Sequence, residues 1–140
     1  YMRLFYGSEI LAGHYAFEKE LPLLAVGSSF LASHAEPAQL FPWEQVVGYR
    51  EDPQVVLGLT WTGDGEAEVD SVRRMLEHYL GDAEGALYFG GHRPVRGYNL
   101  RAEGRYVQIH DPERWVLAVL PADGAIDPGR DILDIGEVRE

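Results

Sequence analysis

Residues 86–110 read ALYFGGHRPVRGYNLRAEGRYVQIH, and this stretch decides the fold class. Its apolar residues fall into three short runs that predict strands, at 86–89, 98–102 and 105–110. In the third run Val107 and Ile109 alternate with other side chains, as in a strand with one buried face. The linkers are of hairpin size, and hairpins join antiparallel strands. The stretch therefore indicates a largely antiparallel sheet.

The residues that follow extend the β pattern. Asp111-Pro112-Glu113 either caps a helix that runs through Leu120 or turns the chain into a strand at 115–120. The valine content and the stop at Pro121 favour the strand. One more short element is expected at 132–138.

The clearest helix is predicted at 66–80. Glu66 and Glu68 lie in its first turn, where carboxylates favour the positive end of the helix dipole. Gly81 stands where a helix commonly ends. Apolar residues repeat between them at helical spacing, namely Val69, Val72, Leu76, Tyr79 and Leu80.

A hairpin is predicted upstream, with strands at 45–50 and 55–61 and a turn at Asp52-Pro53. With Phe41-Pro42-Trp43 before it and a helix after it, this order of elements resembles the small pleckstrin-homology-like barrels of bacteria. The resemblance implies a fold and no functional residue.

The N-terminal part is expected to hold a strand at 3–6, a helix at about 8–19 and a buried strand at 23–32. The fold prediction is α+β: a largely antiparallel sheet or a small, partly open barrel, with helices at 66–80 and 8–19.

Composition narrows the function classes. The 140 residues are 46% hydrophobic, which suits a single domain spanning 1–140 with a sizeable core. A net charge of −11 argues against general binding to nucleic acid or anionic membranes. Cysteine is absent, which excludes disulfides and thiol chemistry.

Further expectations concern origin and location. The apolar runs are too short to span a bilayer, and we expect a cytoplasmic protein. Met2 is expected to be the native start, with Tyr1 a cloning remnant. Eleven of the 12 basic residues are arginine, from which we expect a heat-stable protein.

The loop Gly90–Asn99 is the first candidate site. Residues 86–110 hold four arginines and one acid, against the acidic balance of the chain. Arginines on a glycine-rich loop can grip a carboxylate or phosphate, or can simply pair with carboxylates of the same chain. The candidate binding residues are His92, Arg93, Arg96, Tyr98, Asn99 and Arg101.

Histidine spacing predicts no metal site within one element, because no two histidines stand at i,i+2 or i,i+4. His92 and His110 could still meet in space with Asp111. We predict no metal, no cofactor and no catalytic residue.

The second candidate is an interface patch of Leu40, Phe41 and Trp43, unless these side chains close one end of the core. The sequence thus favours a non-catalytic interaction or regulatory module that binds a protein partner, with a homodimer open. The alternatives are a domain for anions or small ligands, or a small enzyme, using Gly90–Asn99.

Overall fold

The structure is a computed structural model that describes residues 2–81, 85–122 and 124–137. Its helices there are α1 (Met2–Glu20), α2 (Trp43–Val47), the 3-10 helix η1 (Tyr49–Glu51), α3 (Pro53–Thr60), α4 (Ser71–Leu80) and α5 (Pro128–Asp131). The strands are β1 (Ala25–Val26), β2 (Phe30–Ala32), β3 (Leu87–Gly90), β4 (Asn99–Arg101), β5 (Tyr106–Gln108), β6 (Arg114–Ala118) and β7 (Ile132–Glu137).

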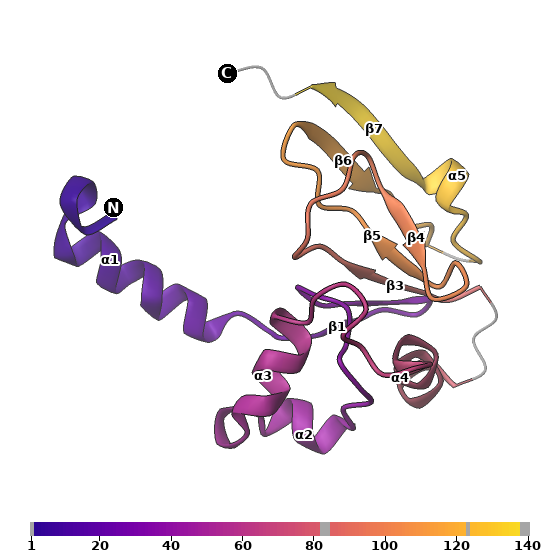
Figure 1. The fold of residues 1–140 in the computed structure, drawn as a ribbon, viewed down its shortest axis with the longest axis horizontal. Helices are drawn as coiled ribbons and strands as arrows, with labels where there is room; N and C mark the ends of the chain where they lie inside the picture. The colour runs from indigo at the N-terminus through magenta and orange to yellow at the C-terminus, as the bar shows by residue number, and fades with distance from the viewer. Residues whose placement is uncertain (1, 82–84, 123, 138–140) are drawn as a thin grey trace.

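A five-stranded sheet in the order β1-β2-β3-β5-β4 forms the middle of the molecule (Figure 1). The sheet is open, since β1 and β4 lie at opposite edges. The α+β class is therefore confirmed. The outer pairs are antiparallel, but β2-β3 and β3-β5 are parallel. The short linkers did not predict these parallel pairs. Helices separate β2 from β3 in the sequence, and β4 separates β3 from β5.

Side chains of the central strands alternate between two apolar cores. On β3, Tyr88 is fully buried towards the helices, while Leu87 and Phe89 face the other way. The helical side adds Leu31, Phe41, Val55, Leu59, Val72, Met75, Leu76 and Tyr106. The far side is covered by the antiparallel hairpin of β6 and β7, through Val116, Ala118 and Ile132, and by Ile126 from the segment that connects the two strands. Fully burying one such side chain stabilises the fold by about 1.5–3 kcal/mol. The helices on one face and the β6–β7 hairpin on the other therefore both stabilise the sheet.

The hairpin predicted at 45–61 is wrong, because this segment forms α2, η1 and α3. The Asp52 side chain accepts a hydrogen bond from the backbone N–H of Gln54 at 3.0 Å, and Pro53 occupies the first helical turn. Asp-Pro is as typical of a helix start as of a turn. Val55 and Leu59, one helical turn apart, are buried. The implied pleckstrin-homology-like barrel has no support once this hairpin is absent.

The helix predicted at 66–80 begins at Ser71, because Asp70 has a left-handed backbone (φ 61°). The strand predicted at 3–6 is also wrong, since those residues belong to α1, which contains the predicted helix 8–19. The single strand predicted at 23–32 is split into β1 and β2, which pair with each other. The strand favoured at 115–120 is confirmed as β6, and the short element expected at 132–138 is the strand β7 over its described residues.

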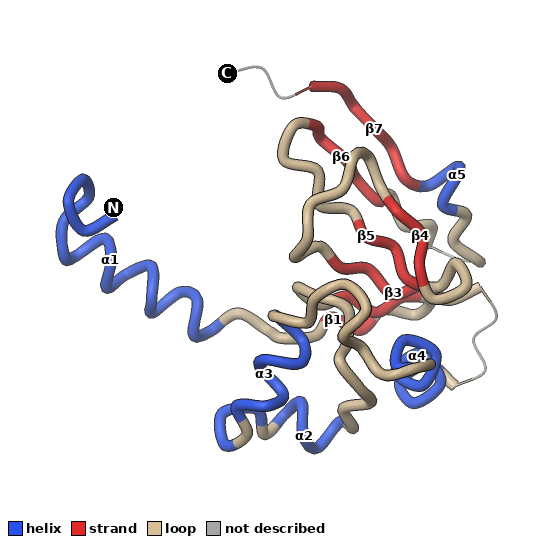
Figure 2. Tube along the Cα trace, in the orientation of Figure 1, coloured by secondary structure: helices blue, strands red, loops and turns tan. Residues whose placement is uncertain are grey.

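Helix α1 extends away from the three layers (Figure 2). It is broken at Gly7, whose φ of 78° and ψ of 169° are not helical. Its last turn touches η1, where the Tyr49 hydroxyl donates to the carbonyl of Lys19 at 3.2 Å.

Candidate functional site

Three histidines gather at the carboxyl ends of the parallel strands. His34, His92 and His110 each stand two residues after the end of β2, β3 and β5. Carboxyl ends of parallel strands share one edge, which is the usual place for a ligand in open α/β sheets. The three side chains line one open pocket of about 380 Å³, whose walls include Phe89 and Ile109. We call His34, His92 and His110 the histidine edge.

Two of these side chains touch. Nδ1 of His92 lies 3.3 Å from Nε2 of His34, and the Trp61 and His92 rings pack edge to face with centroids 5.4 Å apart. Nε2 of His92 is buried without a hydrogen-bond partner among the described residues. Desolvation lowers the pKa of His92, helped by the positive charge of Arg93 and by His34. The lowered pKa favours the neutral imidazole of His92, in which one ring nitrogen keeps a lone pair.

The loop between β3 and β4 is fastened to the end of β5. Its three hydrogen bonds run from Gln108 Nε2 to the Arg93 carbonyl (3.0 Å), from Val95 N–H to the His110 carbonyl (2.8 Å) and from Gly97 N–H to Asp111 Oδ2 (2.6 Å). The backbone N–H groups of Gly97 and Glu113, which both donate to the Asp111 carboxylate, lower the pKa of Asp111. Asp111 thus anchors the loop to the end of β5.

Within the described residues, no group of three or more His, Asp or Glu side chains is arranged to hold a metal ion.

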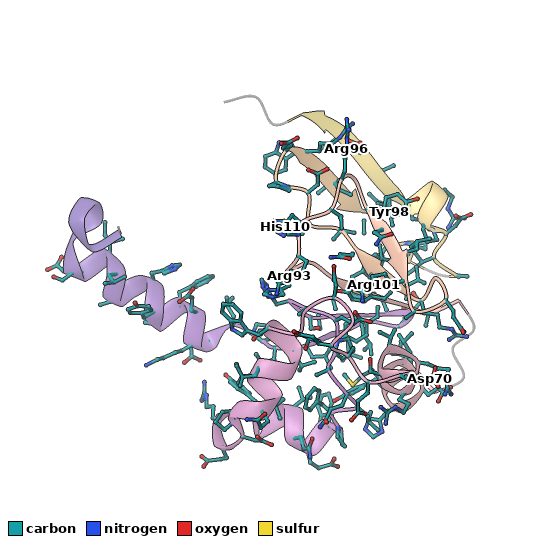
Figure 3. All side chains as sticks on the ribbon, viewed as in Figure 1. Asp70, Arg93, Arg96, Tyr98, Arg101 and His110 are labelled. Carbon is teal, nitrogen blue, oxygen red and sulfur yellow. The ribbon has the colours of Figure 1, made fainter. Side chains whose placement is uncertain are left out.

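The predicted loop residues do not converge on one point. Arg93 lies near the histidine edge, whereas Arg96 extends away from it (Figure 3). Tyr98 and Asn99 are exposed at the start of β4. The structure thus brings His92 together with Arg93 only.

Arg101 is occupied by its own chain. It lies 3.0 Å from Glu36 and 2.5 Å from Asp64, and the Glu36 side chain is only 10% exposed. Burial raises the pKa of Glu36, against the opposing effect of Arg101. Arg101 thus pairs with carboxylates of its own chain, which was the alternative to ligand binding in the sequence analysis.

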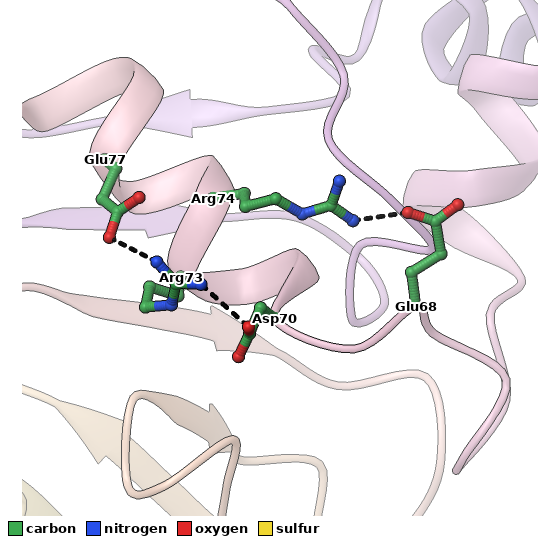
Figure 4. A network of polar contacts seen from close by, with 5 residues as sticks. All are labelled: Glu68, Asp70, Arg73, Arg74 and Glu77. Atoms are coloured by element: carbon green, nitrogen blue, oxygen red, sulfur yellow. Dashed lines mark hydrogen bonds and ion pairs between the residues drawn. The ribbon is translucent and has the colours of Figure 1, made fainter.

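Helix α4 shows the same internal pairing (Figure 4). Arg73 bridges Asp70 at 2.8 Å and Glu77 at 2.9 Å, and Arg74 binds Glu68. Exposed pairs of this kind contribute little to stability. These pairs neutralise arginines that a partner could otherwise contact. Because acids outnumber basic residues by 23 to 12, the unpaired surface charge is mainly negative.

The aromatic patch is divided between core and surface. Phe41 is 2% exposed, its N–H donates to the Met75 sulfur at 3.3 Å, and its carbonyl accepts from the Tyr79 hydroxyl at 2.9 Å. Leu40 packs partly buried against the same core. Trp43 is exposed and lies 6.1 Å from the Tyr79 ring.

An apolar surface that the sequence analysis did not single out covers the outside of β6 and β7. Leu117 pairs with Leu133, and both face away from the sheet beneath. The outward side chains are Trp115, Leu117, Val119, Leu133 and Ile135, each 43–59% exposed. We call these five residues the hairpin face. The sequence does carry a sign of it, because residues 115–120 are apolar at every position, as in a strand covered on both sides.

Comparisons with protein-family models, with curated proteins and with solved structures found no match for this chain. In the described part of the chain, no helix combines the length and the apolar character needed to cross a membrane.

Proposed function

We propose that this protein is a non-catalytic interaction module and that the hairpin face docks a protein partner. The observation that carries the proposal is the set of five large apolar side chains turned outward on two paired strands and at Val119, which directly follows β6. Half-exposed side chains of this size present on the order of 500 Å² of apolar surface, in the range of the largest patches on soluble proteins, which are often functional.

The size of the hairpin face fits a specific contact. Removing on the order of 500 Å² of apolar surface from water is worth about 12 kcal/mol before costs. Association itself costs roughly 4–15 kcal/mol. The apolar contact alone therefore does not guarantee tight binding, and complementary charge around it must decide the partner.

The charge of the segment that carries the hairpin face favours a basic partner. Residues 111–140 hold eight acids and three arginines, and two of those arginines, Arg114 and Arg130, already pair with Asp134 and Asp131. A segment with this net negative charge attracts a basic protein and repels a second copy of this chain. We therefore propose a partner with an apolar centre inside a positively charged surface. We propose that the protein meets this partner in the cytoplasm.

A photocrosslinker tests the proposal. Leu117→p-benzoylphenylalanine, in full-length protein expressed in its source cells, should give an adduct with a basic protein. The same probe at Val47, which is exposed on α2 at the opposite end of the molecule, is the matched control (Figure 1).

The adduct from position 117 should weaken with rising salt and disappear when Trp115→Glu is added. Equal labelling from positions 117 and 47 would overturn the proposal. So would an adduct only with a second copy of this chain.

A further inference from the structure

We propose that His34 and His92 chelate a divalent transition-metal cation, of the Zn²⁺ or Ni²⁺ class, at the histidine edge. This inference is independent of the hairpin face and concerns a different surface of the molecule. It rests on the separation of two ring nitrogens, on the backbone that fixes them and on the pocket into which they open.

The separation of the nitrogens is the one that a metal requires. Imidazole nitrogens bond Zn²⁺ at about 2.0–2.1 Å with tetrahedral angles, which puts two ligand nitrogens about 3.3–3.4 Å apart. Nδ1 of His92 and Nε2 of His34 are 3.3 Å apart. The same separation suits a hydrogen bond between the two rings, so an ion that replaces the shared proton can bind both nitrogens.

The backbone holds both residues in place. Gly91 N–H donates to the His34 carbonyl at 2.9 Å, so the sheet ladder continues to the residue before His92. His92 itself has a φ of 54°, which is uncommon for a residue other than glycine. Strained backbone of this kind clusters at functional sites, and here it places the His92 ring against His34.

The rest of the coordination sphere stays open. His110 lines the same pocket and is the candidate for a third ligand. Since the described residues contain no preformed set of three ligands, a bound ion would keep water or another exchangeable group in its remaining positions. An open position is typical of metal sites that bind a further ligand. The apolar walls of Phe89 and Ile109 would face that ligand.

Calorimetric titration of the tag-free full chain with ZnCl₂ tests the site. We expect one ion per chain, and an affinity at least about tenfold weaker in His34→Ala and in His92→Ala. Loss of even a residue that orients a ligand commonly costs that much. His78→Ala is the matched control, because His78 is an exposed histidine on α4, and it should bind zinc like the wild type.

Copper provides a second readout that does not depend on stability. The electron paramagnetic resonance spectrum of the Cu²⁺ complex should show coupling to at least two nitrogens, and His34→Gln should remove one. Circular dichroism shows whether each variant is folded. If His34→Ala does not fold, His34→Gln replaces it in the zinc titration. Wild-type affinity no higher than that of the His34→Gln/His92→Ala double variant would overturn the proposal. So would loss of binding in His78→Ala.

Discussion

Leu117 of β6 lies directly opposite Leu133 of β7, and both side chains point away from the sheet that the hairpin covers. The hairpin therefore has two apolar sides. Its inner side, with Val116, Ala118 and Ile132, completes the core beneath the sheet. Its outer side is about half exposed in the described chain, and our proposal is that a partner covers it.

The contact between Gly58 and Phe41 gives a first prediction. A Cβ on Gly58 would lie 2.3 Å from the Phe41 ring, too close for any real contact. Gly58→Ala should destabilise the protein by about 1–3 kcal/mol, even though alanine favours the helix. Urea unfolding measures this change. Gly13→Ala is the control, because nothing lies near its Cβ position. Equal stability of both variants would show that α3 does not pack on Phe41.

The cap of α3 gives a second prediction. Asp52→Ala removes the side-chain oxygen that accepts from Gln54 N–H, and should cost about 1 kcal/mol of unfolding free energy. Asp52→Asn should retain most of the stability, because asparagine caps as well. Thermal unfolding distinguishes the two variants. A loss in Asp52→Asn as large as in Asp52→Ala would contradict the cap.

These two positions show why the sequence misled at 45–61. Asp-Pro begins a type I turn or a helix equally well, and the apolar residues of 55–61 fit alternation as well as a helical face. What decides is Phe41, which packs over Gly58 from outside the segment. Local patterns favoured a strand over a helix at β6 and indicated a short element at β7, but they did not predict that the two pair.

The histidine edge was hidden for a similar reason. Each of its histidines lies two residues after the end of a strand. This shared position predicts that they lie close together only when β2, β3 and β5 are known to be parallel. Parallel pairing depends on contacts between residues far apart in sequence, such as Leu31 and Tyr88. The sequence accordingly singled out His92, weighed His110 and missed His34.

The arginines give a third prediction. Arg101 neutralises the buried Glu36, whereas Arg93 is exposed and makes no ion pair with any described residue. Arg101→Ala should destabilise the protein by about 1–3 kcal/mol, between the values for exposed and buried pairs. Arg93→Ala should change it by less than about 0.5 kcal/mol. Chemical denaturation of both variants checks this contrast, and the reverse order would refute the assigned roles.

The pKa of Glu36 gives a fourth prediction. Burial raises this pKa above its ordinary value of 4.5, so the folded chain holds the proton more tightly than the unfolded chain. The contribution of Glu36 to stability must then decline as the pH rises from below 4.5 through the raised pKa. Glu36→Gln removes this decline, so its stability relative to the wild type should increase between pH 4 and pH 7. Denaturation at a series of pH values measures the difference, and a flat or falling difference would contradict the raised pKa.

The most direct test of the central claim is the affinity of the crosslinked partner for the hairpin face. Leu117→Glu places a charge at an exposed position, where it should leave the fold intact. We expect this variant to bind the purified partner at least about tenfold more weakly than the wild type, or about 1.4 kcal/mol. Val47→Glu, a matched change on α2, should bind as the wild type does. Equal dissociation constants for the wild type and Leu117→Glu would contradict the account.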